Sequence, residues 1–377
     1  MRVLLQPRAH LAYGQDFLNS ALAKSFDFTI WPEQMTGKYL ARPQNEVTQL
    51  VVSQNPDHEA DARFLRTIPE NAARVVHLHC RWHYYSNIQQ QTVLQSLRSA
   101  NLGIVPDRFL KHEIQKIFPD LDWHIAPNGV RQDLYYPSTD EERDEFRRRH
   151  NIFGLSKIIG FVGRIENAKG FQVLQYVCEN IHKTDAKIFI QFPGWQAIGE
   201  QVGDRYEKKA SALRLIDTRR VIIFADRHPL IGKNQRPVRC FDALVLPSLS
   251  EVQPLVILEA LACGISVIAT KATPFYDWLV ELGFGPYCKF VELPERLQAV
   301  ERGKLTHEAS EVEEIGKQII AAICELRPTN YAERQELSRL LERSGFTQDK
   351  MIERFEKLYN YAIARANIRA SGTPHAA

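Results

Sequence analysis

The chain has 377 residues, which is enough for two domains of ordinary size, each with its own hydrophobic core. Hydrophobic residues make up 44% of it, and its formal net charge of +3 is too small to indicate a nucleic-acid-binding protein by itself. The six cysteines are scattered without a C-x-x-C motif, which is typical of the reduced thiols of a cytosolic protein, and no apolar stretch approaches a membrane span.

The first part of the chain alternates short apolar runs with amphipathic stretches. Buried strands are expected at residues 2–6, 48–53, 74–80, 102–105 and 123–126. Helices are expected from the apolar spacing of residues 17–26, 86–100 and 107–118. The ends of these strands are of interest, because ligands bind at the carboxyl edge of a parallel sheet.

Three histidines lie around the end of the expected strand 74–80. His77 and His79 are two residues apart and would share one face of the strand, and His83 lies just beyond it. One interpretation is the metal site of a hydrolase, since His-x-His on a strand is a metal-ligand arrangement. The other is structural, with one histidine packed and hydrogen-bonded in the core. A lone Asp-x-Asp at Asp120 and Asp122 precedes a strand instead of ending one, and we interpret it as a solvated loop.

Residues 107–118 form a basic amphipathic segment with apolar, Lys and Arg side chains at helical spacing. A helix of this kind can lie on an anionic membrane surface. More often, such a helix packs its apolar side on the core of its own domain. Both interpretations stay open at the level of the sequence.

Strands alternate with helices again from residue 157 to residue 270, and this alternation predicts a parallel, doubly wound sheet. The expected strands are 157–162, 186–191, 221–225, 242–246 and 266–270, with helices at 171–180 and 255–263. Further helices are expected at 139–150, 312–326, 331–343 and 351–366. Pro254 suits the first position of helix 255–263, and Gly264 suits its end.

Two glutamates flank the start of the helix at 255–263. Glu251 precedes the helix, and Glu259 lies about five residues inside it, roughly 8 Å along the axis. Free N–H groups and the positive end of the helix dipole suit a phosphate there, and the carboxylates on either side are good acceptors for sugar hydroxyls. The alternative is one solvated glutamate and one ordinary helix glutamate.

A basic turn follows the expected strand 157–162, with Arg164 and Lys169 between Gly163 and Gly170. The guanidinium is a planar fork and the ammonium is a point charge, and both suit phosphate oxygens. The alternative is a solvated basic turn.

These motifs resemble the signature of retaining glycosyltransferases of family 4, which have the two-domain GT-B architecture. The matching residues are Gly163, Arg164, Lys169, Gly170, Pro247, Ser248, Glu251, Glu259, Ala260, Ala262, Gly264, Val267, Ile268 and Ala269. A partial match, Pro127 to Val130, corresponds to the motif that closes the first domain in the family. Two departures stand out: Val252-Gln253-Pro254 replaces the Gly-Phe-Gly of the family, and Gly14 alone remains of a turn that is usually glycine-rich.

The resemblance implies an α/β fold of the GT-B type, in which two Rossmann-like, doubly wound domains face a central cleft. It implies an acceptor domain at residues 1–137 and a nucleotide-sugar domain at residues 138–345. Residues 346–377 would form a closing helix that packs back on the first domain, followed by a frayed tail.

The resemblance also implies where the donor would bind. Arg164 and Lys169 would hold the diphosphate and stabilise its departing charge, together with the N–H groups of Leu255 and Val256. Glu251 would bind hydroxyls of the donor sugar, Glu259 the ribose, and His79 would face the sugar from the first domain. The remaining residues expected at the site are Gly14, Gly163 and Pro254 for the donor, and Arg81, His83 and Tyr84 for the acceptor.

The function implied is retaining transfer of a hexose-type sugar to a glycan or lipid-linked acceptor, in polysaccharide or lipopolysaccharide assembly. A UDP-sugar is the first expectation for the donor and a GDP-sugar the second, with no metal or other cofactor required and no nucleic acid as partner. The protein is expected in the cytoplasm, with residues 107–118 as the segment for a peripheral membrane contact. Two alternatives remain: a metal-dependent hydrolase that uses His77 and His79, and a catalytically silent GT-B protein that binds a nucleotide sugar.

Overall fold

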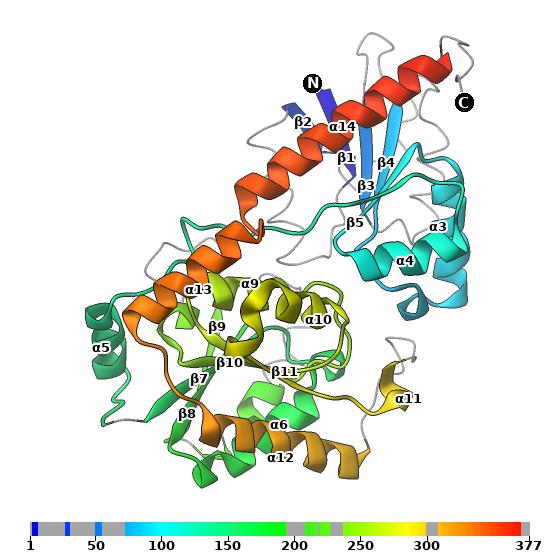
Figure 1. Cartoon of the computed structure of the whole chain (residues 1–377). Coiled ribbons are helices and arrows are strands. Elements are labelled where there is room, and N and C mark those ends of the chain that lie inside the picture. Colours follow the sequence, from blue (N-terminus) through cyan, green and yellow to red (C-terminus); the bar gives the residue numbers. More distant parts are fainter. Residues whose placement is uncertain are drawn as a thin grey trace. The chain divides into compact units, whose positions relative to one another are not determined.

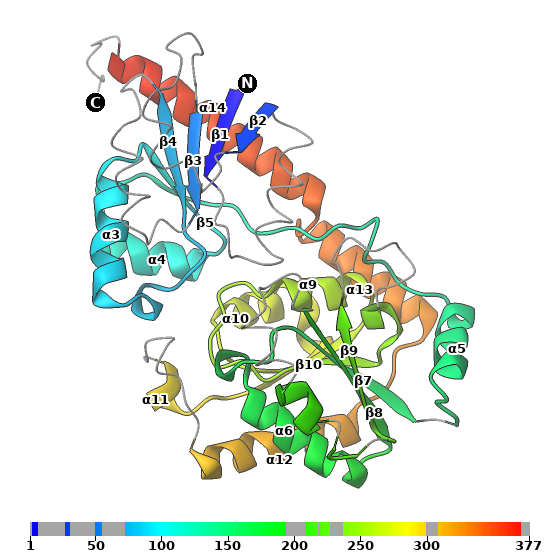
Figure 2. The same cartoon turned by 180° about the vertical axis from the view of Figure 1, so that it is seen from behind.

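The computed structural model describes residues 2–6, 27–30, 50–54, 72–154, 156–193, 208–213, 215–217, 219–226, 237–298 and 308–370. By its contacts the chain divides into two units, which Figures 1 and 2 show from opposite sides. The first unit contains Met1–Asn128 together with Gln348–Ala377, and the second contains Gly129–Thr347. Gly14 and the helix expected at 17–26 lie outside the described residues.

In the described part of the first unit, six strands form one parallel sheet. Their order is β2 (Asp27–Ile30), β1 (Arg2–Gln6), β3 (Leu50–Gln54), β4 (Ala73–His77), β5 (Leu102–Val105) and β6 (Trp123–Ile125). The expected strand 74–80 is too long, because β4 ends at His77. The last hydrogen bond between β4 and β5 runs from Leu78 N to Ile104 O (2.9 Å). The segment after β5 then reaches Pro106, which has no N–H to donate.

Two helices follow β4 and β5, as the sequence predicts. α3 (Asn87–Arg98) begins after Ser86, which forms a reciprocal capping box with Gln89. α4 (Arg108–Ile117) begins after Asp107, whose carboxylate accepts the backbone N–H groups of the first turn. Because α4 buries Leu110 and Ile114, its apolar side packs inside the first unit.

The long helix α14 (Gln348–Ala370) belongs to the first unit, where it packs across β3 and β4 (Figure 2). Its buried residues are Met351, Phe355, Tyr359, Ala362 and Ala366. They form one hydrophobic core with strand residues such as Val52, Val75 and Ile104. The expectation that the last helix packs back on the first domain is therefore confirmed.

Six strands also form one parallel sheet within the described residues of the second unit. Their order is β12 (Cys288–Val291), β11 (Ser266–Thr270), β10 (Ala243–Leu246), β7 (Lys157–Val162), β8 (Ala186–Pro193) and β9 (Val221–Asp226). The chain runs outward from β7 in one direction and from β10 in the other, so the strand order reverses between these two strands. Such a reversal is the usual ligand-binding point of a doubly wound sheet.

The helices of the second unit cover both faces of this sheet (Figures 1 and 2). Within the described residues, these helices include α5 (Asp140–Arg149), α6 (Phe171–Asn180), α9 (Leu255–Ala262), α10 (Phe275–Leu279), α11 (Glu295–Gln298), α12 (Ala309–Glu325) and α13 (Tyr331–Arg343). α6 and α12 lie side by side on one face, and α9 and α13 lie together on the other. α9 ends before Gly264, which adopts a left-handed conformation (φ +73°) as the sequence predicts.

The second unit begins earlier than the expected boundary after residue 137, because residues 129–143 are bound to it. The N–H of Val130 donates to Phe346 O (2.8 Å). Arg239 donates to the carbonyl of Tyr136 and to Glu142, and the buried Arg334 donates to the carbonyl of Ser138. These hydrogen bonds attach the segment to the rest of the second unit both before α5 and within its first turn.

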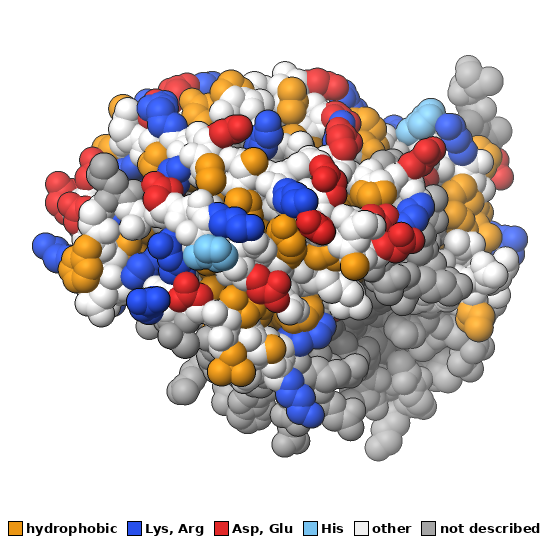
Figure 3. All heavy atoms as spheres, turned by 90° about the horizontal axis from the view of Figure 1, so that it is seen from below, with side chains coloured by type: hydrophobic (Ala, Val, Ile, Leu, Met, Phe, Trp, Pro, Cys, Tyr) orange, Lys and Arg blue, Asp and Glu red, His pale blue; other side chains and the backbone are white. Residues whose placement is uncertain are grey.

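The molecular surface shown in Figure 3 carries Lys, Arg, Asp and Glu side chains interspersed with one another. This mixture agrees with the small net charge of the sequence. Among the helices of the described ranges, none is both long and apolar enough to span a membrane.

Candidate functional site

Two loops meet where the strand order of the second unit reverses. Residues 163–170 follow β7, and residues 247–253 follow β10. Leu249 N donates to Ala168 O (2.9 Å), so the two loops are joined through their backbones. Gly170 has a φ of +70°, and a Cβ at this position would lie 1.7 Å from Pro247 O. The approach therefore requires glycine, both for its conformation and for its lack of a side chain.

This junction brings Lys169 and Glu251 together across 82 positions of sequence. Lys169 Nζ lies 2.5 Å from Glu251 Oε1, and the side chains are 18% and 9% exposed. Arg164 lies on the same loop as Lys169 and pairs with Glu166, with its Nη2 2.9 Å from Oε1. The site thus presents a half-exposed guanidinium, an ammonium group and a buried carboxylate at the carboxyl edge of the sheet.

The N-terminus of α9 follows directly from the loop that carries Glu251. Pro254 is the N-cap and not the first helical residue, since its backbone is extended (φ −71°, ψ 110°) and its carbonyl accepts the N–H of Ile257 (3.1 Å). No side chain caps this helix end. The N–H groups of Leu255 and Val256 therefore lack the intrahelical acceptors that later residues have, which makes the helix start suitable for an anion.

The loop segment Val252-Gln253-Pro254 is held in place by a residue that follows β11. Thr273 Oγ1 donates to the carbonyl of Val252 (2.8 Å), and Gln253 is buried. Glu259 lies one turn further along α9 and is partly exposed. Glu251 and Glu259 therefore lie before and within the first part of the same helix, as the sequence predicts.

His77 and His79 have different environments in the first unit. His77 is fully buried, its ring stacks on Phe355 with centroids 4.9 Å apart, and its Nε2 lies 3.2 Å from the hydroxyl of Tyr359. It is the packed core histidine of the structural interpretation. His79 lies just past the end of β4, and burial lowers its pKa to about 4. Its imidazole is therefore neutral at physiological pH and can act as a hydrogen-bonding group.

The ring centroids of His77 and His79 are 6.0 Å apart, although only His77 lies within β4. Among the residues that the structure describes, however, no group of three or more His, Cys, Asp and Glu side chains is arranged to hold a metal ion. The hydroxyl of Tyr359 engages Nε2 of His77, which is one of the two ring nitrogens that could bind a metal. The described residues thus give no support to the hydrolase alternative.

Arg81, His83 and Tyr84 lie on the loop after His79, at the carboxyl edge of β4. Residues Trp82–Tyr84 form a single 3-10 turn, and the ring of His83 packs edge-on against Tyr84 with centroids 4.3 Å apart. Arg81 and His83 both contact Glu113 of α4, a residue that the sequence analysis did not single out. Its position on an amphipathic helix gave no signal, because its partners lie thirty residues earlier in the chain.

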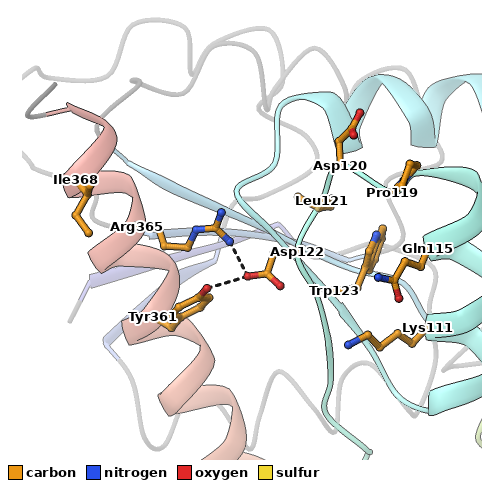
Figure 4. A pocket seen from close by; sticks show the side chains of 10 residues that line it. All are labelled: Lys111, Gln115, Pro119, Asp120, Leu121, Asp122, Trp123, Tyr361, Arg365 and Ile368. Atoms are coloured by element: carbon orange, nitrogen blue, oxygen red, sulfur yellow. Dashed lines mark hydrogen bonds and ion pairs between the residues drawn. The ribbon is translucent and has the colours of Figure 1, made fainter. Parts of the chain in front are cut away.

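A separate hollow lies between α4, α14 and the loop before β6 (Figure 4). It has a volume of about 580 Å³. Tyr361 and Arg365 point from α14 toward Asp122 and donate to its Oδ2 at 2.9 and 2.6 Å. Asp122 is therefore tied to the closing helix, and the interpretation of Asp120 and Asp122 as a solvated loop holds only for Asp120. The hollow lies at the amino edge of the sheet, opposite His79.

Comparison with known proteins gives one matching family. Residues 142–302 match the family described as "Glycosyl transferases group 1". This range contains the two loops of the candidate site, residues 163–170 and 247–253, and α9. A D-inositol 3-phosphate glycosyltransferase of Corynebacterium jeikeium is 34% identical over 152 residues, which are 39% of this chain and 35% of that protein. The chain thus spans about a third of the length of this relative.

Two solved structures cover almost the whole chain. Anabaena HepE in complex with UDP-glucose has a TM-score of 0.70 at 14% identity, over 96% of this chain and 100% of its own. Sucrose-phosphate synthase from Thermosynechococcus elongatus has a TM-score of 0.68 at 14% identity, over 97% and 99% of the two chains. The fold is therefore GT-B, with two Rossmann-like parallel sheets in two units.

Proposed function

We propose that this chain is a glycosyltransferase that moves a hexose-type sugar from a nucleotide-diphosphate sugar to an acceptor, with retention of the anomeric configuration. The observation that carries the proposal is the contact between Lys169 and Glu251 (2.5 Å). In a nucleotide sugar, the β-phosphate is bonded directly to C1 of the sugar. A site for this group needs a cation and a hydroxyl-binding carboxylate side by side, and these two residues meet that need. The family match over residues 142–302 supports the same assignment.

The proposed diphosphate site consists of three kinds of donor. Lys169 and Arg164 supply positive charge from one loop. The N–H groups of Leu255 and Val256, at the start of α9, supply hydrogen-bond donors. As the bond to the sugar breaks, negative charge grows on the β-phosphate. Fixed cations and helix N–H groups stabilise that charge more than they stabilise the ground state, which accelerates the reaction. Gly163 precedes Arg164 and Pro254 precedes Leu255, and these two residues shape the backbone that presents the donors.

The sugar and ribose are assigned to the carboxylates. Glu251 would accept hydrogen bonds from hydroxyls of the donor sugar, and Glu259, further along α9, from those of the ribose. From the first unit, His79 would contact the sugar as a neutral imidazole, because burial keeps its pKa low. Arg81, His83 and Tyr84 remain the proposed acceptor residues.

The proposed reaction balances without a cofactor. The bond between C1 and the β-phosphate oxygen breaks, and its electron pair stays on that oxygen. An acceptor hydroxyl forms the new bond to C1 on the same face, and its proton passes to the departing phosphate oxygen. The products are the glycosylated acceptor and a nucleoside diphosphate, so this path uses no protein nucleophile and no metal.

A UDP-sugar is the first proposal for the donor and a GDP-sugar the second. HepE, which has the same fold, was solved with UDP-glucose, and this supports the first choice. A glycan or lipid-linked acceptor in polysaccharide assembly is proposed, with action in the cytoplasm. A peripheral membrane contact through residues 107–118 stays a prediction.

The donor site can be tested with a thermal-shift panel of UDP, GDP, ADP, CDP and TDP. A ligand that binds only the folded state at about 100 times its Kd adds about 2.7 kcal/mol of stability. We expect one nucleotide to raise the melting temperature of the wild type, and Lys169→Ala and Glu259→Ala to lose most of that shift. Lys317→Ala is the matched control, because it removes an exposed Lys–Glu pair on α12 (2.7 Å) outside the site.

Turnover separates the enzyme from a silent binding protein. The wild type should release nucleoside diphosphate from the nucleotide sugar that stabilises it most, with an acceptor mixture or with water. The anomeric configuration of the product, followed by NMR, should match that of the donor. Binding without any turnover would favour the silent protein, and the absence of binding to every nucleotide would overturn the proposal.

A further inference from the structure

One carboxylate in the first unit holds three consecutive residues of another segment. Glu113 Oε2 accepts from Arg81 Nη1 at 2.8 Å, and its Oε1 accepts from the backbone N–H of Trp82 at 2.8 Å. His83 Nδ1 lies 3.7 Å from the same Oε1. Glu113 thus contacts both side chains and the backbone of the loop that begins at Arg81, directly after His79 and Cys80.

These contacts are partly shielded from water. The side chains of Arg81 and Glu113 are 11% and 22% exposed. Burial by itself would raise the pKa of Glu113, but the nearby ring of His83, the charge of Arg81 and the N–H of Trp82 outweigh it, and the pKa lies below its ordinary value. Glu113 therefore stays ionised, and charge-assisted hydrogen bonds in such an environment are stronger than neutral ones.

Glu113 stands on a rigid support. α4 is fixed at its start by Asp107, which is fully buried and accepts the N–H groups of Phe109 (2.9 Å) and Leu110 (2.7 Å). The helix is held against the sheet by its buried residues Leu110 and Ile114. Because β4 and β5 are neighbours, α4 and the loop after β4 start from the same edge of the sheet. A movement of Glu113 would therefore be transmitted to the loop, and not absorbed by α4.

We infer that Glu113 is a positioning residue for the transfer reaction. It touches neither donor nor acceptor in this assignment. It acts through Arg81, Trp82 and His83, and so fixes the backbone three residues after His79 as well as the proposed acceptor residues. The inference rests on the proposed function. It adds a residue that lies on α4, away from the loop of His79, and that belongs to none of the sequence motifs described above. A misplaced catalytic group costs as much as about 100-fold in rate, so a residue with this role is measurable.

The test uses Glu113→Ala and Glu113→Gln in the full chain. The rate is followed as release of nucleoside diphosphate from the nucleotide sugar that stabilises the wild type most, well below the melting temperature of each variant. We expect kcat to fall by about tenfold or more in Glu113→Ala, and Glu113→Gln to recover part of the loss because an amide oxygen can still accept from Trp82 N–H. The Kd for the free nucleotide, measured by calorimetry, should stay unchanged, since Arg164, Lys169 and Glu259 lie in the second unit.

The matched control is Glu142→Ala. It removes the hydrogen bonds from Arg239 Nη2 to both carboxylate oxygens (3.1 and 2.9 Å) and so breaks a comparable Glu–Arg pair outside the site. It should lower stability without lowering kcat. Histidine side-chain NMR gives a readout that needs no turnover, because the signal of His79, assigned from His79→Gln, should shift in Glu113→Ala and not in the control.

The two proposals fail in different ways. An unshifted His79 signal and a kcat within about twofold of the wild type in Glu113→Ala would overturn the positioning role and leave the proposed function intact. A wild type that binds no nucleotide and releases none would overturn the proposed function, and the positioning role with it.

Discussion

At the scale of single residues, the chemistry of the candidate site depends on pairs that the chain brings together from a distance. Lys169 and Glu251 are the clearest case, because neither is unusual in its own segment. A lysine in a turn and a glutamate in a loop are ordinary. Their contact is the observation that distinguishes a candidate site from two separate solvated charges. The spacing motifs predicted both residues, and the loop junction at Gly170 explains how they meet.

His79 leads to a prediction about acid stability. Its pKa is about 4 in the folded protein and about 6.5 in an unfolded chain. Between these values the unfolded chain binds more protons, so stability falls as the pH falls from about 6.5 toward 4. His77 acts in the same direction, since burial lowers its pKa well below the ordinary value.

We therefore expect the free energy of unfolding in urea to decrease between pH 7 and pH 5. In His79→Gln this decrease should be smaller by up to about 2 kcal/mol, because one of the two groups no longer titrates. His112→Gln serves as the control, since the exposed ring on α4 is solvated in both states. Equal pH dependence of the wild type and His79→Gln would contradict the assigned burial.

At the scale of elements, local signals predicted the helices well. Ser86 with Gln89, Asp107, and Gly264 each mark a helix end through hydrogen bonds or backbone conformation that a few neighbouring residues decide. Strand ends are less local. β4 stops at His77 because its neighbour β5 leads into Pro106, and no pattern within residues 74–80 contains that information.

Gly170 gives a prediction for the loops at the site, with Gly154 as its natural control. Both have positive φ, at +70° and +67°, but a Cβ on Gly154 meets nothing within 4 Å, whereas one on Gly170 would lie 1.7 Å from Pro247 O. Gly154→Ala should cost only the 1–2 kcal/mol or so of a left-handed alanine. Gly170→Ala should cost clearly more and should also weaken nucleotide binding, because the loops must separate.

Chemical denaturation of the two glycine variants, together with nucleotide calorimetry, checks this expectation. Equal losses of stability in both would mean that the loops separate without cost. The junction between Gly170 and Pro247 would then have no part in holding Lys169 near Glu251.

At the scale of the whole molecule, the two units differ in how the chain builds them. The hydrophobic core of the second unit runs from Val130 to Phe346 in one continuous segment, closed by the hydrogen bond between these two residues. The core of the first unit needs residues from both ends of the chain, since Phe355 and Tyr359 of α14 cover its strands.

We expect a fragment of residues 129–347 to fold alone, with a cooperative urea transition and binding of the same nucleotide as the full chain. A fragment of residues 1–128 should not fold alone, because the apolar face that α14 buries would be exposed to water. Circular dichroism and denaturation of both fragments test the division. A folded 1–128 fragment, or an unfolded 129–347 fragment, would be evidence against it.

The amino-acid sequence predicts the α/β class and most element positions, and it nominates the candidate residues of the second unit. These depend on periodicity, capping and short motifs, which are local properties of the chain. Tertiary structure alone decided that His77 is a core residue, that Asp122 binds α14, and that Glu113 holds the loop after His79. Each of these depends on a contact between segments far apart in sequence, and burial and hydrogen bonding at such contacts follow from packing and not from neighbours along the chain.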